Sequence, residues 1–374
     1  MTKKFNKINQ ANQIGNVGFD KTNKKNYFAC SNTCLGFINL FNIIFSSEKL
    51  EKIYIIKDCG GLSFLNEISR KAEEKKYSAE HFLCPVDMNR LNGIIIKELK
   101  TAVINENLNM QGNYPVILEN IVNFNDFFDE AKLTKQKKAI FNLIKQKNEY
   151  YKLAYKFLRA ANELAENITE LSEKYINHEK LASFVERIAE NRVNEKHLHD
   201  SKDSECYDEY KFINSVSADG LTELDTFELN SKKIFYVSNE NFSGWRFMDY
   251  ILKKLENSCK VLCPDALNPN KIKTVFLKKS QILFIIKEKD TNKIYSDKYS
   301  FINMERFIDK NFKKNNKQKL RFIQKCYKSI LSEAVKYFSE IKDLNKNIEN
   351  IYESAVKINE KNKYTDIIIK RIFS

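Results

Sequence analysis

The chain has 374 residues, 43% of them hydrophobic, so it is long enough for two domains of ordinary size, each with a sizeable core. It has no apolar run of about 18 residues and no apolar stretch near its polar N-terminus, which excludes a predicted transmembrane helix and a secretion signal. We therefore expect a cytoplasmic protein without a membrane partner. Its formal charge of +14 favours polyanionic partners, although general lysine enrichment explains much of the excess.

The first half predicts an α/β core. Residues 1–26 are expected to be flexible. The apolar spacing within Phe28–Phe45 predicts an amphipathic helix over a sheet. Ile53–Ile56 has the character of a buried parallel strand, and Phe64–Lys76 predicts the helix that follows it. Further strands are predicted at His81–Cys84, Ile94–Ile96, Thr101–Ile104 and Val116–Val122.

A long helix is predicted to follow this core. From Thr134 to Tyr175, apolar residues recur every three, four or seven positions without Pro or Gly, which indicates one helix of about 60 Å. We expect Leu181–Asn191 to return antiparallel beneath it. The polar stretch 194–209 predicts a linker.

The second half repeats this programme. The first strands are offset by 234 − 53 = 181 residues, and Leu83-Cys84-Pro85 and Leu262-Cys263-Pro264 by 262 − 83 = 179. Two similar offsets predict a duplicated domain. We expect an α/β protein with two three-layer α/β domains, residues 27–193 and 210–374, each with a long helical arm, and we expect the arms to pack together. The second half predicts strands at Ile234–Val237, Val261–Cys263, Thr274–Leu277 and Ile282–Ile286, a helix at Phe247–Leu255, and a long helix from Ile323 to Ala355.

Each half also has the strand, tight polar loop and helix of a phosphate-binding unit. A working loop reads G-x-x-x-x-G-K-[ST]: backbone amides surround the phosphates, the lysine bridges them, and the hydroxyl holds Mg²⁺. The candidate cofactor-binding positions are Lys57, Asp58, Cys59, Gly60, Gly61, Leu62 and Ser63 in the first loop, and Asn239, Ser243, Gly244, Trp245 and Arg246 in the second.

These features resemble an uncharacterised bacterial family of tandem P-loop ATPase-like proteins, whose typical members carry a loop similar to GxPGTGKST in each half. The resemblance implies two P-loop NTPase folds and, for typical members, ATP binding. The matching segments are Ile53–Lys57, Leu83-Cys84-Pro85, Ile95–Leu99 and Phe124–Lys132 in the first half, and Ile234–Val237, Ser243-Gly244 and Leu262-Cys263-Pro264 in the second.

Both loops depart from the family pattern. Gly61 stands at the lysine position and Leu62 at the hydroxyl position of a first loop that is about three residues short. In the second loop, Trp245 replaces the lysine and Arg246 the Ser/Thr. We therefore expect no cofactor, with ATP and Mg²⁺ as the alternative if Lys57 or Arg246 compensates. No metal site is expected.

Three further groups of residues are candidates. Glu98 follows an apolar strand and is a weak catalytic candidate, as a strand-end acid that positions water or metal. Cys84 and Cys263 precede prolines at strand ends, where a functional thiol is an alternative to packing. The basic block Lys310–Arg321 is a candidate nucleic-acid site through Lys313, Lys314, Lys317 and Lys319.

Three hypotheses for the function follow. The first is a degenerate ATPase-like protein that does not hydrolyse nucleotide and acts as a scaffold for a protein partner. The second is an ATP- or GTP-binding NTPase or switch with atypical phosphate loops. The third is a nucleic-acid-binding module that uses the basic C-terminal arm.

Overall fold

The computed structural model describes residues 25–46, 49–57, 62–106, 119–192, 207–287 and 297–374. Most of the predicted flexible N-terminus and of the predicted linker lies outside these ranges. Lys25 and Asn26, which were expected to be flexible, belong to the first strand. None of the described helices is long and apolar enough to cross a membrane.

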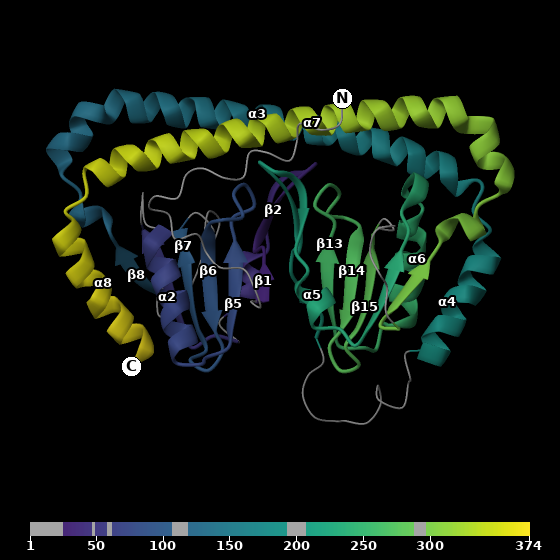
Figure 1. Ribbon diagram of the computed structural model, residues 1–374, viewed down its shortest axis with the longest axis horizontal. Coiled ribbons are helices and arrows are strands. Elements are labelled where there is room, and N and C mark those ends of the chain that lie inside the picture. The colour runs from purple at the N-terminus through teal and green to yellow at the C-terminus, as the bar shows by residue number, and fades with distance from the viewer. Residues whose placement is uncertain (1–24, 47–48, 58–61, 107–118, 193–206, 288–296) are drawn as a thin grey trace.

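Each half of the chain contains a six-stranded mixed sheet (Figure 1). The first sheet has the order β1 (Lys25–Tyr27), β5 (Ala79–Leu83), β6 (Leu91–Ile96), β7 (Thr101–Asn105), β4 (Lys52–Lys57) and β8 (Glu119–Asn123). The second has the matching order β9 (Glu209–Tyr210), β13 (Lys260–Pro264), β14 (Ile272–Leu277), β15 (Ile282–Ile286), β12 (Lys233–Val237) and β16 (Tyr299–Ile302). In both sheets the third strand is antiparallel to its two neighbours, and the other pairs are parallel. The α/β class and the tandem arrangement are therefore confirmed.

The register between the halves is 181 residues across most of the sheet. Glu80 pairs with Ile95, and Val261 with Phe276, so 261 − 80 = 276 − 95 = 181. The two Leu-Cys-Pro segments, offset by 179, are therefore not equivalent positions. Cys84 corresponds instead to Asp265: each donates its amide to the carbonyl six residues on, that of Arg90 or of Lys271.

The predicted helix within Phe28–Phe45 is wrong. These residues form a hairpin of β2 (Cys30–Thr33) and β3 (Gly36–Asn39), followed by the one-turn helix α1 (Phe41–Ile44). Gly36 turns the hairpin at a φ of 106°, which glycine adopts without strain. The second half repeats the hairpin with β10 (Asn214–Ser217), β11 (Gly220–Glu223) and the short helix α5 (Thr226–Leu229).

The two sheets share an inner core and carry separate outer helices. Buried side chains of both inner faces meet around α1 and α5, and the edges of the halves join where Phe28 and Phe212 exchange backbone hydrogen bonds of 2.8 and 3.2 Å. Helix α2 (Leu62–Glu74) covers the outer face of the first sheet, and α6 (Gly244–Lys254) that of the second (Figure 1). The inner layer of each predicted three-layer domain is thus common to both.

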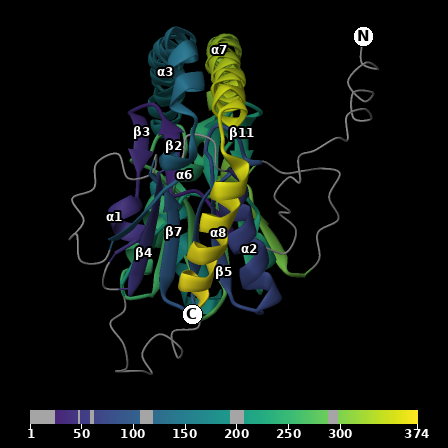
Figure 2. The same ribbon diagram turned by 90° about the vertical axis from the view of Figure 1, so that its left-hand side faces the viewer.

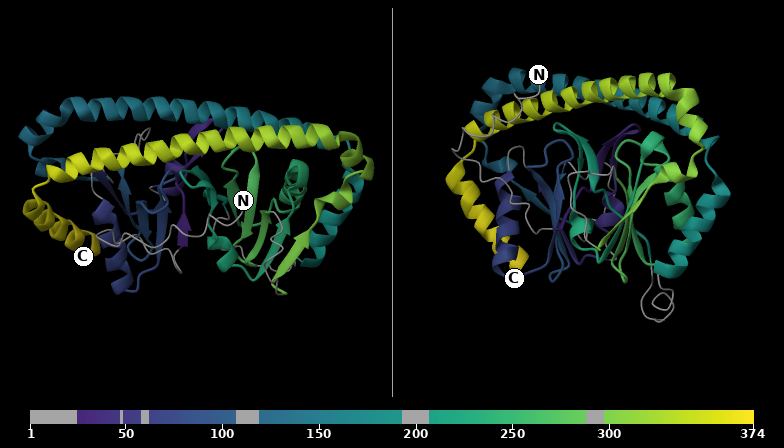
Figure 3. Two further views of the ribbon diagram at one scale, coloured as in Figure 1. Left: turned by 45° about the horizontal axis from the view of Figure 1, so that its top comes forward. Right: turned by 45° about the vertical axis from the view of Figure 1, so that its right-hand side comes forward.

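The predicted arms are the long helices α3 (Glu130–Glu173) and α7 (Lys310–Ser354), which pack side by side across the top of both sheets (Figures 1 and 3). Short 3-10 turns precede them, Asn125–Phe127 and Met304–Phe307. Each helix starts at an aspartate N-cap: Asp129 accepts from the amide of Lys132, and Asp309 from that of Asn311. Buried Ala and Leu or Phe positions on one stripe form the contact between the arms.

The arms cross to the opposite half, which the sequence did not predict. Helix α4 (His178–Arg192), expected to fold back beneath its own arm, instead packs on α6 of the second half. Helix α8 (Ile358–Phe373) packs against α2 of the first half, beside which it lies in Figure 2. Each crossing is fixed by an antiparallel bridge, Ile176 with Ile308 and Val356 with Phe128. The halves therefore exchange their terminal helices.

A buried ion pair lies between the halves. Lys211 donates to Glu80 at 2.7 Å, its ammonium lies 4.2 Å from the centre of the Tyr27 ring, and Lys97 contacts the other carboxylate oxygen at 2.9 Å. Burial alone raises the pKa of Glu80, but Lys211 and Lys97 outweigh it and lower that pKa to about 2.

Candidate functional site

The second loop follows β12 at the carboxyl ends of the parallel strands, which is where open α/β sheets bind ligands. It contains a 3-10 turn at Glu240–Phe242, and Asn241 and Phe242 have positive φ angles of 53° and 54°. Such angles are unusual for residues other than glycine. Ser172 of α3 donates to the Asn241 carbonyl at 3.2 Å, so the helical arm helps to hold this backbone.

The backbone amides of this loop are used within the loop itself. The Phe242 amide donates to the Asn239 carbonyl at 2.9 Å, and the Ser243 amide to the Glu240 carbonyl at 3.2 Å. The Gly244 amide donates to the side chain of Asn239 at 3.2 Å, and the Arg246 amide to the Ser243 carbonyl at 3.2 Å. In a working phosphate loop such amides face the phosphate oxygens.

Gly244 closes the loop against the end of the strand. A Cβ atom at this position would lie 2.8 Å from the Ser238 carbonyl oxygen and 3.1 Å from Oδ1 of Asn239. Only glycine fits here without a shift of the backbone, because real Cβ atoms do not approach a carbonyl so closely. The close approach of Gly244 therefore serves loop closure, whereas a phosphate loop uses its glycines to admit the ligand.

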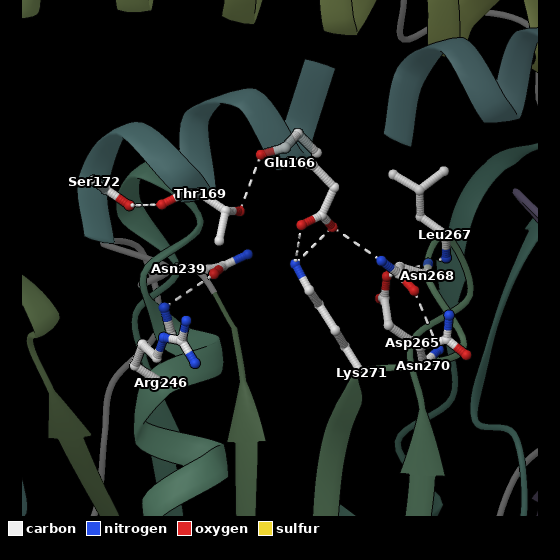
Figure 4. Close-up of polar contacts among 12 residues, drawn as sticks. Glu166, Thr169, Ser172, Asn239, Arg246, Asp265, Leu267, Asn268, Asn270 and Lys271 are labelled. Carbon is white, nitrogen blue, oxygen red and sulfur yellow. Dashed lines mark hydrogen bonds and ion pairs between the residues drawn. The ribbon is translucent and has the colours of Figure 1, made fainter. Parts of the chain in front are cut away.

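The two residues that replace the catalytic pair have partners elsewhere. The Trp245 side chain is 8% exposed, and Lys271 lies 5.6 Å from its ring centre. Arg246 donates through Nε to Glu173 of α3 at 2.6 Å and through Nη1 to Asp249 at 3.1 Å. Glu173 in particular raises the pKa of Arg246. Arg246 thus joins the loop to the arm (Figure 4).

A cavity of about 910 Å³ lies between this loop and the two arms. Its floor is formed by the loop, the segment after β13, and the ends of β14 and β15, and its roof by α3 and α7. Its charged lining residues are the basic Lys271, Lys273, Lys287, Lys313, Lys314, Lys317, Arg321 and Lys328, and the acidic Glu166, Glu223, Glu240 and Asp265.

Ion pairs join the roof of the cavity to its floor. Glu166 of α3 accepts from Lys271 at 2.6 and 2.9 Å and from the Asn268 side chain at 2.9 Å (Figure 4). Lys273 and Lys287 both contact Glu223. Burial raises the pKa of Asp265, whose carboxylate accepts from the amides of Leu267 and Asn268 and so shapes the turn. The deep part of the cavity is therefore close to electrically balanced.

The predicted basic residues of α7 divide between cavity and solvent. Lys313, Lys314 and Lys317 line the cavity, and Lys319 does not. Lys313 pairs with Glu240 at 3.0 Å and also with Glu305. Sequence reasoning missed Lys328, which lies one helical turn after Gln324 on the same face; the spacing of the basic residues along the helix was the available signal.

In the first half, Asp58, Cys59, Gly60 and Gly61 lie outside the described residues. Leu62 and Ser63 open α2, and Lys57 pairs with Glu106 at 3.4 Å. The register of 181 leaves equal numbers of residues between the strands, 79 − 57 = 260 − 238 = 22, so the first loop is not shorter than the second. The same register places buried Phe64 opposite Trp245.

Glu98 lies in the turn between β6 and β7. Because β6 is antiparallel to its neighbours, this turn lies at the sheet edge opposite the loops, and both Glu98 oxygens accept from the amide of Ser78 at 2.8 Å. Its position is that of a residue that closes a turn. Burial raises the pKa of the thiols of Cys84 and Cys263, which favours neutral packing side chains over reactive thiolates.

Comparisons of the chain with protein-family models, with curated protein sequences and with solved structures give no match.

Proposed function

We propose that this protein is a tandem ATPase-like scaffold that does not hydrolyse nucleotide. The observation that carries the proposal is the internal satisfaction of the second loop: four of its amides donate to loop oxygens, and Trp245 occupies the lysine position. Phosphoryl transfer needs oriented donors and a cation at the transferred group. A loop that is closed on itself supplies neither.

The connection between the arms and the sheets supports the scaffold part of the proposal. Each arm begins on one half, contacts the other arm, and delivers its terminal helix to the opposite half. NTPase switches depend on segments that rearrange with the state of the phosphate. Here Ser172, Glu173 and Glu166 of α3 all bind the loop or the segment next to it. We infer a fixed platform that presents its surface to a protein partner.

The test is release of inorganic phosphate from ATP and GTP by the purified full-length chain with Mg²⁺. The proposal expects a rate equal to that of the buffer blank. Any rate in excess of the blank that co-purifies with the chain and is lost on replacing Lys57 or Arg246 by Met would overturn it, because those are the only residues to which compensation was assigned.

A further inference from the structure

A row of basic side chains on α7 faces the cavity without acidic partners. Lys314, Lys317, Arg321 and Lys328 line the cavity, are exposed, and form no ion pair or hydrogen bond with any of the residues that the structure describes. The deeper cations Lys271, Lys273, Lys287 and Lys313 are neutralised by neighbouring glutamates. The uncompensated positive potential of the cavity therefore comes from this row.

The row is linear. Its members are three, four and seven residues apart, so they follow one face of the helix over an axial length of roughly 21 Å at about 1.5 Å per residue. A single phosphate group or a short phosphate tail would use only part of that length. An extended chain of regularly spaced phosphates would contact all four side chains.

The duplication supplies an internal control for lysine enrichment. The arms correspond at an offset of 180 residues, as shown by their N-caps Asp129 and Asp309 and by the bridging residues Ile176 and Val356. The positions of α3 that match the four cations hold Thr134, Lys137, Phe141 and Asn148. Enrichment across the whole chain would affect both arms equally, whereas the row exists only on the arm segment that lies over the cavity.

The start of α7 also carries charge of the sign that a helix disfavours. Its first turn has no acidic residue, whereas α3 begins with Glu130. Lys310, Lys313 and Lys314 stand where the helix dipole repels cations. Placing cations there costs folding stability unless an anion compensates them, and only Lys313 has described acidic partners.

An aromatic wall accompanies the row. Phe242 of the loop and Tyr327 of α7 line the cavity, are partly exposed, and contact each other edge to face with ring centres 5.5 Å apart. Basic grooves with adjacent aromatic rings are typical of sites for single-stranded nucleic acid, in which cations follow the backbone and bases stack on rings.

We propose that the cavity beneath the arms binds a single strand of nucleic acid, whose phosphates contact Lys314, Lys317, Arg321 and Lys328 and whose bases enter toward Phe242 and Tyr327. This inference goes beyond the scaffold and does not depend on whether nucleotide is hydrolysed. It identifies the polyanion as a strand because the cations form a row and because unpaired bases have faces that can stack.

The test is fluorescence anisotropy of a labelled oligothymidylate with the full-length chain over a series of salt concentrations. The site variant is Lys314→Gln/Lys317→Gln/Arg321→Gln. The matched control is Lys135→Gln/Lys138→Gln/Lys145→Gln, which removes the same charge from exposed positions of α3 outside the cavity. Thermal unfolding of both variants confirms that they are folded.

We expect the site variant to lose at least tenfold in affinity at low salt. Its slope of log K against log salt should fall by about 2, since each phosphate contact on a single strand contributes about 0.7. The control should bind within about twofold of the wild type. Trp245 emission, a second readout from the cavity wall, should change on addition of unlabelled oligothymidylate.

Three results would overturn the proposal: no binding at low salt, equal losses in the two triple variants, or displacement of the strand by tripolyphosphate at equal phosphate concentration. The second would mean that only net charge matters. The third would mean that bases contribute nothing and that the site takes free polyphosphate.

Discussion

In the second loop, the residues that depart from a phosphate-binding sequence each have a structural partner. Asn239 accepts from the Gly244 amide, Trp245 lies beside Lys271, and Arg246 pairs with Glu173. These contacts fix the loop in a closed conformation. The residue types that fail as a catalytic site are thus the ones that attach the loop to the arm.

Gly244→Ala should destabilise the chain by about 1–3 kcal/mol, the usual cost of overpacking, because the added Cβ would meet the Ser238 carbonyl oxygen at 2.8 Å. Urea unfolding followed by circular dichroism measures this change. Lys319→Ala, at an exposed position of α7, is the control and should change stability by less than about 0.5 kcal/mol. A Gly244→Ala protein as stable as the control would show that the loop is free to open.

Glu80 should make stability depend on acid pH. Its pKa in the folded chain is about 2, below the ordinary value of 4.5, so its contribution is full above pH 4.5 and is lost as the pH falls toward 2. In Glu80→Gln, the Lys211 ammonium stays buried without its anion, which should cost about 3 kcal/mol at neutral pH. The variant should also lose less stability than the wild type between pH 5 and 3, as measured by urea midpoints. Parallel curves for the two proteins would contradict this role.

At the scale of elements, sequence patterns predicted what local periodicity determines and missed what tertiary contacts determine. The strand at Ile53–Ile56 and both long helices follow from their apolar spacing. The hairpin after Phe28 was missed because Ser31 and Asn32 are buried polar residues that are satisfied only by carbonyls of Asn214 and Val216, in the other half. The direction of β6, which moves Glu98 away from the loops, depends on pairing and not on composition.

The crossed helices give a reciprocal prediction. Ile368→Asp on α8 places a charge in the core around Phe64 and Ile68, so it should loosen the first half. Val185→Asp on α4 places one against α6 and should loosen the second. Hydrogen exchange should therefore rise mainly in α2 for the first variant and mainly in α6 for the second. The opposite assignment, with each variant loosening its own half of the sequence, would contradict the crossing.

Over the whole molecule, the duplication was readable from two offsets in the sequence, yet the exchange of helices was not. The apolar stripe of α4 fits beneath its own arm as well as it fits α6, and only the path of the 44-residue helix α3 decides between them. The candidate site was partly predictable: the loop and three of the lysines were identified, but the cavity depends on both arms lying over one loop.

The crossing also predicts that the halves stay together when the chain is cut. A protease site inserted between residues 194 and 206, a stretch outside the described residues, allows cleavage at one point. Because α4 and α8 are each packed on the opposite half, both fragments should co-elute on size exclusion at physiological salt. Separation of the fragments without denaturant would show that the exchanged helices contribute little to the association.

The account depends most on the claim that the second loop no longer receives a nucleoside triphosphate. Trp245 is the single tryptophan of the chain and stands at the lysine position, so its emission reports directly on that site. The most direct measurement is a titration of Trp245 fluorescence with Mg-ATP at an ionic strength of about 0.15 M. The account predicts no saturable change up to millimolar ATP. A saturable, Mg²⁺-dependent change at sub-millimolar ATP would contradict it.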